Sequence, residues 1–287
     1  MTLPFSCFIC GLARDCAGAL SGSLRSVERL VGCFQHADFV VVTNDSDDAT
    51  AQILTDWAAT RRWVKVLNVD GVASAIVGRT ERLAVLRNFY LVELRRRLKA
   101  GCRYDLMAVV DLDEVNQNLS VGAELGDVIL QAPVDWGGLF ANQRQAYYDV
   151  WALRHPRWCP DDCWQSVAKF QQIGWGDWHF LRRFQTQAGV AARRRYVGER
   201  QVKIDPEDEP IEVDSAFGGF AIYKTSALAS SWYSGRDSAG HEVCEHVAFN
   251  LGIRRIGAKL YIMPALLNDS PAEHLVLGSG SVERPWR

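Results

Sequence analysis

Two glycine-rich loops that commonly hold phosphate groups are missing from this sequence. No Gly-x-Gly-x-x-Gly segment follows a predicted strand, and no Gly-x-x-x-x-Gly-Lys segment is present. In dinucleotide-binding proteins and P-loop nucleotidases these loops hold phosphates through backbone N–H groups. Their absence argues against both classes.

Charge of one sign is not in excess, because 32 Lys and Arg residues stand against 34 Asp and Glu residues. The net charge of −2 gives no basic field that would attract nucleic acid, and we expect no nucleic-acid partner. The arginines are nevertheless clustered, for example at 95–97 and 193–195. Most such clusters are solvated helix faces, but the guanidinium group also fits phosphate, so one or two are candidates for phosphate binding.

Long apolar runs are missing as well. The N-terminal stretch has no basic leader, and its apolar part is too short for a membrane span and is cut by Arg14 and Asp15. We therefore expect no signal peptide and no transmembrane helix. The expected location is the cytoplasm, with the eight cysteines reduced and with peripheral association at the inner face of the membrane left open.

What the sequence does contain is an alternation of strands and helices. Buried strands are predicted at 5–10, 39–42, 63–69 and 106–110, with amphipathic helices between them at about 17–33, 46–59 and 79–99. This alternation predicts an α/β fold with a mostly parallel sheet flanked by helices. No linker divides the chain, so we expect a single domain over 1–287, with a nucleotide and metal part at about 1–134 and an acceptor part at about 135–287.

The apolar run at 106–110 ends abruptly at Asp111-Leu112-Asp113. Side chains alternate along a strand, so the two carboxylates point the same way while Leu112 points back into the protein. Two like charges at a strand end repel each other unless a hard cation such as Mg²⁺ or Mn²⁺ neutralises them. The pattern predicts a divalent-metal site for a phosphorylated ligand; a solvated acidic loop is the alternative.

The second half of the chain has a different texture. Residues 147–178 are crowded with aromatic side chains, and 182–202 is a basic stretch in which we expect a strand. Exposed tryptophans offer flat apolar surfaces to sugar rings, so the stretch from Trp151 to Trp178 is the candidate acceptor site. Most tryptophans are buried on average, and the alternative is that these belong to the core.

In this order, the motifs resemble the GT-A family of nucleotide-sugar glycosyltransferases. They are a strand–turn–helix start, Asn44-Asp45-Ser46, an arginine-rich helix ending in Leu86-Arg87-Asn88, the Asp-x-Asp strand end, Phe217-Gly218-Gly219, Cys244-Glu245-His246 and a late His274. Within that family the arginine-rich helix is most similar to bacterial relatives of the fungal mannosyltransferases of the Anp and capsule-associated groups. The resemblance covers about residues 5–274 and implies a GT-A-like fold.

The resemblance also implies roles for individual residues. Asp111 and Asp113 match the pair that holds Mn²⁺ or Mg²⁺ and the donor diphosphate, and His274 matches a third metal ligand. Glu245 matches the acidic position near the acceptor, which supplies the catalytic base in many inverting members. The residues expected to bind the donor nucleotide are Arg14, Asp45, Arg79, Arg82, Arg87, Asp111, Gly218 and Gly219.

Several of these residue types also have ordinary structural roles. Asp45 lies in a turn-rich run, where Asp normally caps backbone N–H groups. The pair Gly218-Gly219 supplies φ > 0 and close backbone approach, which a tight turn needs as much as a ligand does. His246 is an alternative to His274 as the metal ligand, although a helical position favours packing.

The sequence thus predicts a metal-dependent hexosyltransferase. It would use a GDP- or UDP-linked sugar and a glycan or lipid-linked acceptor; the donor, the linkage and the anomeric outcome stay open. A nucleotidyltransferase that makes sugar nucleotides is the second hypothesis, but it normally needs a glycine-rich basic loop after the first strand, and the segment at 11–15 is poor in glycine. A non-catalytic carbohydrate-binding protein is the third.

Overall fold

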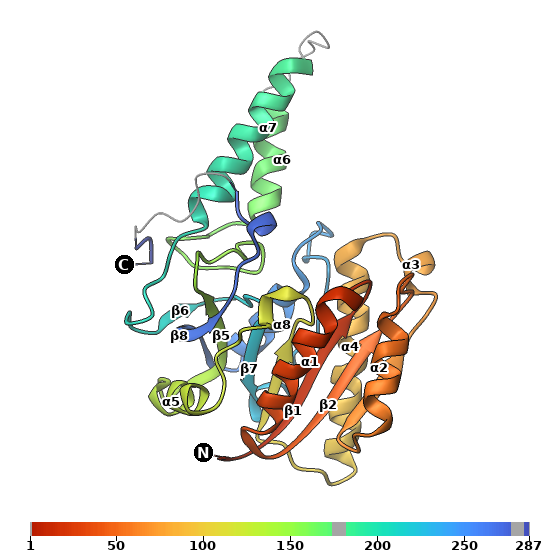
Figure 1. The fold of residues 1–287 in the computed structure, drawn as a ribbon. Helices are drawn as coiled ribbons and strands as arrows, with labels where there is room; N and C mark the ends of the chain where they lie inside the picture. Colours follow the sequence, from red (N-terminus) through yellow and green to blue (C-terminus); the bar gives the residue numbers. More distant parts are fainter. Residues whose placement is uncertain (1, 174–181, 277–283, 287) are drawn as a thin grey trace.

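The computed structural model describes residues 2–173, 182–276 and 284–286 (Figure 1). Within these ranges, eight strands form one sheet in the order β3-β2-β1-β4-β7-β5-β8-β6. The strands are β1 (Leu3–Ala13), β2 (Phe34–Thr43), β3 (Val64–Asn68), β4 (Leu106–Val110), β5 (Trp136–Gln143), β6 (Ile211–Val213), β7 (Phe220–Lys224) and β8 (Lys259–Asn268). The predicted α/β class with a mostly parallel sheet is confirmed.

Helices cover both faces of the sheet, because successive residues of each strand point to opposite sides. Ile9 of β1 and Ala108 of β4 pack in one core with α1 and α2, while Phe8 and Met107 pack in a second core with α4. The α-helices are α1 (Ala17–Val31), α2 (Thr50–Ala59), α3 (Val72–Ala75), α4 (Arg79–Lys99), α5 (Ala123–Gln131), α6 (Cys163–Ile173), α7 (Arg182–Tyr196) and α8 (Glu245–Arg254).

The direction of the sheet changes at β7, and this change shapes the site. Strands β1, β2, β3 and β4 are parallel, whereas β7 runs antiparallel between β4 and β5. Val110, the last residue of β4, pairs with Phe220, the first residue of β7. The glycine turn before β7 therefore lies beside the residues that follow β4, and the Asp111 N–H donates to the Gly219 carbonyl oxygen at 2.9 Å.

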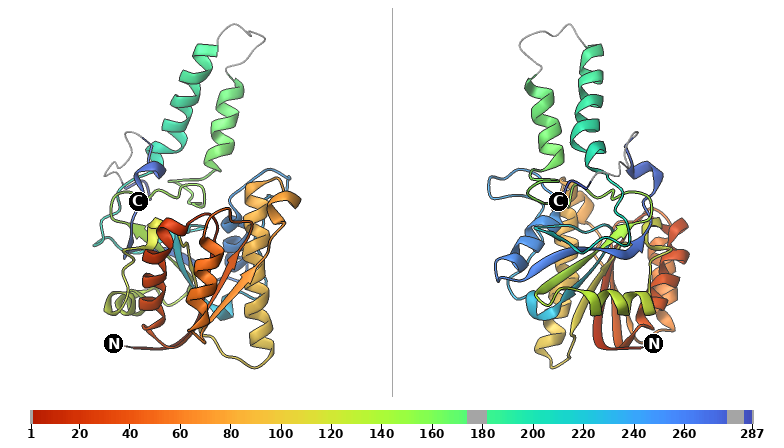
Figure 2. Two further views of the ribbon diagram at one scale, coloured as in Figure 1. Left: turned by 45° about the vertical axis from the view of Figure 1, so that its right-hand side comes forward. Right: turned by 90° about the vertical axis from the view of Figure 1, so that its left-hand side faces the viewer.

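Helices α6 and α7 pack against each other and project from the end of the sheet (Figure 2). The expected strand within 182–202 is wrong, because α7 occupies most of this stretch. Trp175 and Trp178, two of the tryptophans expected near an acceptor, lie outside the described residues. None of the helices in the described ranges is both long and apolar enough to cross a membrane.

Candidate active site

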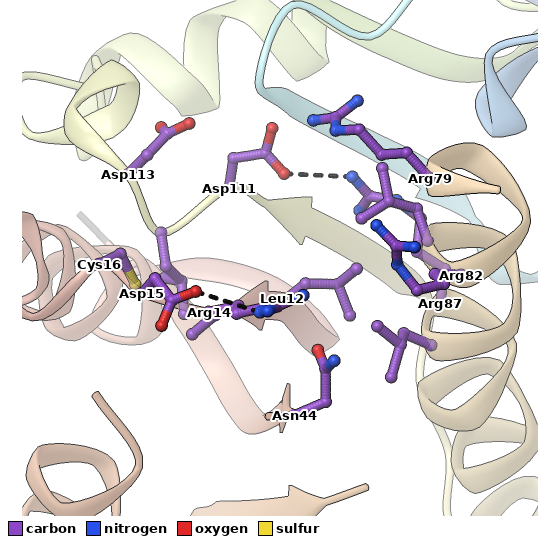
Figure 3. A pocket seen from close by; sticks show the side chains of 14 residues that line it. Leu12, Arg14, Asp15, Cys16, Asn44, Arg79, Arg82, Arg87, Asp111 and Asp113 are labelled. Carbon is purple, nitrogen blue, oxygen red and sulfur yellow. Dashed lines mark hydrogen bonds and ion pairs between the residues drawn. The ribbon is translucent and has the colours of Figure 1, made fainter. Parts of the chain in front are cut away.

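A cavity of about 390 Å³ opens where β1, β2 and β4 end. Figure 3 shows Asp111 and Asp113 on one side of it and three arginines of α4 on the other. The carboxyl ends of parallel strands are where ligands bind in open α/β sheets. The lining residues are Leu12, Ala13, Arg14, Asp15, Cys16, Asn44, Arg79, Arg82, Leu83, Leu86, Arg87, Asp111, Leu112 and Asp113.

The two carboxylates of the Asp-x-Asp segment both face this cavity, and Leu112 between them is 1% exposed. Burial raises the pKa of Asp111 to about 7; Asp113 adds to the rise, whereas Arg87 opposes it. Burial also raises the pKa of Asp113, although its Oδ1 accepts the Val115 N–H at 3.1 Å. The pair thus carries unfavourable negative charge that a cation would relieve.

Arg87 is the buried cation closest to this pair. Its Nη2 donates to Asp111 Oδ1 at 3.3 Å and its Nε donates to Glu245 Oε1 at 2.9 Å. One guanidinium group therefore joins the strand end to α8. Its Nη1 is buried and has no hydrogen-bond partner within the described residues.

The other predicted arginines also line the cavity. Arg14 pairs with Asp15 at 3.1 Å, and Arg82 donates to the carbonyl oxygens of Ile76 and Val77. Arg79 is exposed and makes no ion pair within the described part of the chain. The cavity therefore offers an anionic ligand several guanidinium groups, and two of them, Arg79 and Arg82, have no carboxylate partner within the described residues.

Asp45 does not line the cavity; Asn44 does. The Asp45 carboxylate accepts the N–H groups of Gly71 at 2.6 Å and Ala73 at 2.8 Å, and these bonds lower the pKa of Asp45 to about 2. Asp45 therefore fixes the start of α3 in the way the capping alternative predicts. Asn44, which precedes Asp45 in the same loop, is the residue that lines the cavity.

Buried side-chain amides hold the glycine turn in place. The Asn116 amide donates to the Gly219 carbonyl oxygen at 2.7 Å, and the amides of Gln143 and Asn268 donate to the Gly218 carbonyl oxygen at 3.1 and 2.8 Å. Gly218 and Gly219 have φ of 66° and 80°, which L-residues rarely adopt. A Cβ at Gly219 would lie 2.6 Å from Val115 Cγ1, and one at Gly218 would lie 2.7 Å from the Ala141 oxygen. The turn therefore needs glycine at both positions for its own backbone, whether or not it also contacts a ligand.

Glu245 and His246 lie deeper than the cavity. Both are at most 3% exposed, and neither lines it. The His246 ring stacks on Phe217 with centroids 3.8 Å apart, and burial, together with the Arg87 charge, keeps its pKa well below the usual value. His246 is therefore neutral and packed, and Glu245 acts on the site through Arg87.

Asp149 is a site residue that sequence reasoning missed. Its Oδ2 accepts the Gly218 N–H at 3.0 Å and its Oδ1 accepts the Ala152 N–H at 3.3 Å. Burial raises the pKa of Asp149 to about 6, and the charges of Asp111 and Glu245 contribute to the rise. No motif marks this residue; the only signal is an acid within the aromatic stretch.

His274 packs against Tyr148 and does not line the cavity that contains the acidic pair. The two rings are 5.0 Å apart, and both side chains line a second cavity that also includes Trp151 and Trp164. Across the described ranges, no cluster of three His, Cys, Asp or Glu side chains forms a metal site. The structure thus brings Asp111 and Asp113 together without His274.

These residues fit a divalent metal ion with two protein ligands. Carboxylate oxygens are the donors that Mg²⁺ and Mn²⁺ prefer, and such ions commonly take their remaining ligands from water and from substrate phosphates. Burial raises the pKa of both Asp111 and Asp113 even though the Arg87 charge opposes the rise, as expected where a further cation would stabilise the charged carboxylates.

The sheet order and the placement of the helices are those of the GT-A glycosyltransferase fold. The mannosyltransferase PcManGT from Pyrobaculum calidifontis, solved in complex with GDP-Man and Mn²⁺, aligns with 94% of this chain at a TM-score of 0.50 and 13% identity. TarS 1–349 of S. aureus in complex with UDP-GlcNAc aligns with 94% of this chain at a TM-score of 0.47 and 14% identity. This chain spans 59% and 60% of the lengths of those two proteins.

These likenesses concern the fold. No protein-family model matches the sequence, and no curated protein matches it either. The narrower resemblance to the Anp and capsule-associated groups stays a prediction.

Proposed function

We propose that this protein is a metal-dependent glycosyltransferase that moves a hexose from a nucleoside diphosphate sugar to a glycan or lipid-linked acceptor. The observation that carries the proposal is the composition of one cavity: two carboxylates at a strand end face the arginines of α4 and Arg14, which directly follows β1. A diphosphate with a divalent ion needs both kinds of charge in one place. The GDP-Man and Mn²⁺ bound by PcManGT, which has the same fold, support this assignment.

In the proposed donor complex Asp111 and Asp113 hold Mn²⁺ or Mg²⁺. When bound, the ion supplies Lewis-acid stabilisation of the leaving diphosphate, which can be worth several kcal/mol. Arg79, which has no ion pair within the described residues, and Arg82 bind the phosphate oxygens from the α4 side. Arg14 approaches from the end of β1, where the nucleoside would lie beside Asn44.

Arg87 and Glu245 act as positioning residues in this scheme. Arg87 binds Asp111 and keeps one of its carboxylate oxygens directed toward α4, and Glu245 fixes the Arg87 guanidinium by the 2.9 Å bond. Glu245 is 3% exposed and its Oε1 already accepts from Arg87, so a second carboxylate is better placed to meet an acceptor hydroxyl. Asp149, beside the glycine turn, has that position.

The nucleotidyltransferase alternative is less well supported. It needs a glycine-rich loop directly after β1, whereas Gly11 belongs to β1 itself and packs against the Val110 carbonyl oxygen. A non-catalytic carbohydrate-binding protein would make no use of the acidic pair. The thermal-stabilisation test described next, which includes Asp113→Ala, separates this alternative from our proposal.

The test is thermal stabilisation by UDP and by GDP, each with and without Mn²⁺. A nucleotide at about 100 times its dissociation constant should add roughly 2.7 kcal/mol to the free energy of unfolding. We expect a Mn²⁺-dependent shift with one nucleotide, its loss in Asp113→Ala, and its retention in Asp127→Ala, which removes an exposed acid on α5. Absence of any shift in folded wild-type protein would contradict the proposed donor site. An equal shift in Asp113→Ala and in wild type would show that nucleotide binding does not depend on the acidic pair.

A further inference from the structure

A second cavity, of about 630 Å³, lies between the Tyr148–Trp151 segment, the helical hairpin of α6 and α7, and the segment around His274. We call it the hairpin cavity. It is lined by Tyr148, Asp149, Val150, Trp151, Trp164, Val190, Arg193, Arg194, Val197, Gln201, Glu273, His274, Leu275 and Val276. None of these residues lines the first cavity, between the acidic pair and the arginines of α4, which we call the donor cavity after its proposed role.

The inner end of the hairpin cavity meets the donor site across the glycine turn. Asp149 accepts the Gly218 N–H at 3.0 Å, and the next residue, Gly219, accepts the Asp111 N–H at 2.9 Å through its carbonyl oxygen. A Cβ built on Gly219 would lie 3.1 Å from the Tyr148 hydroxyl. Two glycines therefore separate an acid of the hairpin cavity from the acidic pair.

Aromatic rings line the middle of the hairpin cavity. The Trp151 indole N–H donates to Asp162 Oδ2 at 3.2 Å, which fixes the orientation of that ring. Trp164 of α6 is 36% exposed, although large apolar side chains are mostly buried in this protein. Fixed, partly exposed rings offer the apolar faces on which sugar rings stack.

The outer wall of the hairpin cavity is cationic. Arg193 and Arg194 of α7 are exposed, and neither makes an ion pair within the described residues. The Arg193 guanidinium lies over the Trp164 ring, 5.4 Å from its centroid. By contrast, Arg154 nearby is neutralised by Asp162 at 2.7 Å. The acids that line the cavity are Asp149 at the inner end and Glu273, which is exposed.

We infer that the hairpin cavity binds an acidic glycan acceptor, with an acceptor hydroxyl at Asp149 and a phosphate or carboxylate group of the same glycan at Arg193 and Arg194. This inference rests on the proposed glycosyltransferase function and adds the chemical class of its acceptor. The cavity combines an acid beside the glycine turn, aromatic faces, and two guanidinium groups, one of which lies over Trp164. A neutral glycan would use the first two and leave the arginines without a partner.

The test uses an array of immobilised neutral, phosphorylated and uronic-acid glycans, probed with the 287-residue chain in the presence of Mn²⁺ and the nucleotide that stabilises it. We expect signals for acidic glycans at least tenfold above those for matched neutral glycans. The double variant R193E/R194E should lose this preference by tenfold or more. The control R62E/R195E makes the same change in net charge at exposed arginines outside the cavity, and it should stay within about twofold of wild type.

Three outcomes overturn the inference: no bound glycan, equal signals for neutral and acidic glycans, or equal losses in the two double variants. Thermal stabilisation by nucleotide and Mn²⁺, measured on the same preparations, separates this failure from failure of the proposed function. Stabilisation by nucleotide and Mn²⁺ without a preference for acidic glycans contradicts only the proposed class of acceptor. Absence of nucleotide stabilisation in the wild-type protein contradicts the proposed donor site itself.

Discussion

Arg87 and Glu245 lie 158 positions apart in the chain and form a buried ion pair, with 2.9 Å between Nε and Oε1. Each side chain is 5% exposed. Removing one member of a buried pair leaves the other charge without compensation, which typically costs 3 to 5 kcal/mol. The pair therefore decides both the stability of the site and the orientation of Asp111.

The first prediction concerns this pair. Arg87→Ala should lower the free energy of unfolding by roughly 3 to 5 kcal/mol in a urea titration. Arg254→Ala, which breaks partly exposed bridges to Glu212 and Asp214, should cost under about 1 kcal/mol. The double variant R87M/E245L should lose less than the sum of its single changes. Equal costs for the Arg87 and Arg254 variants would show that burial does not strengthen the pair.

The second prediction concerns the metal and pH. Metal ligands must be deprotonated to bind, and the pKa of Asp111 is raised to about 7 by burial and by Asp113. The affinity for Mn²⁺ should therefore fall as the pH is lowered below 7, by up to about tenfold per pH unit. Calorimetric titrations at pH 6, 7 and 8 measure this directly. An affinity that does not change over this range would contradict an Asp111 ligand with a raised pKa.

The third prediction concerns Asp149, whose pKa rises from the ordinary 3.8 to about 6 in the folded protein. An acid with a raised pKa binds more protons when folded, so its contribution to stability is present at low pH and is lost as the pH rises through 6. Asp149→Asn should therefore gain stability relative to wild type between pH 4.5 and pH 7.5, by on the order of 1 to 3 kcal/mol. Burial is the main cause of the raised pKa of Asp149, and the negative charges of Asp111 and Glu245 add to it.

Urea titrations at the two pH values measure the effect of Asp149, and Asp127→Asn, an exposed acid on α5, is the control. The control should follow wild type at both values. If the difference between Asp149→Asn and wild type is the same at pH 4.5 and 7.5, Asp149 has no raised pKa and is a cap for Gly218 and Ala152 alone.

The fourth prediction concerns the glycine turn. Gly219→Ala should lower the free energy of unfolding by about 1 to 3 kcal/mol, because its φ is 80° and its Cβ would lie 2.6 Å from Val115 Cγ1. Gly18→Ala in α1 meets no atom within 4 Å and should stabilise by roughly 0.5 to 1 kcal/mol. Thermal denaturation of both variants provides the comparison. A neutral Gly219→Ala would mean that the turn can change its conformation.

The fifth prediction concerns His274. Its ring packs on Tyr148, 5.0 Å away, in the hairpin cavity. We expect His274→Ala to keep the Mn²⁺-dependent shift by nucleotide within a few tenths of a kcal/mol, whereas Asp113→Ala abolishes it. A comparable loss in both variants would restore His274 as the third ligand and imply that the segment at 272–276 moves when the donor binds.

The strand end was predictable because its pattern is local. Five apolar residues followed by Asp-Leu-Asp specify a buried strand whose two carboxylates emerge on one side, and the structure has this arrangement. The arginines of α4 were expected from the family resemblance rather than from a local pattern. They reach the site because a crossover helix begins near the carboxyl ends of the strands, which places its first turns beside the cavity. At the strand end, the few residues that form the sequence pattern also determine the direction of the two carboxylates.

The remainder depends on contacts between distant segments. Asp149 joins the site only because β7 reverses direction and brings Gly218 to it, and no pattern near Asp149 indicates that. The stretch 182–202 was misread because its arginines and scattered apolar residues have no clear period, whereas packing against α6 makes it a helix. Asp45 accepts the Gly71 N–H in the structure. The sequence alone does not show whether an Asp in such a turn caps the backbone or binds a ligand.

The hairpin of α6 and α7 has a consequence for how this protein can be redesigned. Both helices leave the main body together, and α7 carries Arg193 and Arg194 without supplying any residue to the donor cavity. A transplanted hairpin from a protein of the same fold would therefore exchange one wall of the second cavity and leave the strand ends intact. Under the proposed function, chimaeras built at Cys163 and Tyr196 would change the acceptor that is bound while leaving the proposed nucleotide site unchanged.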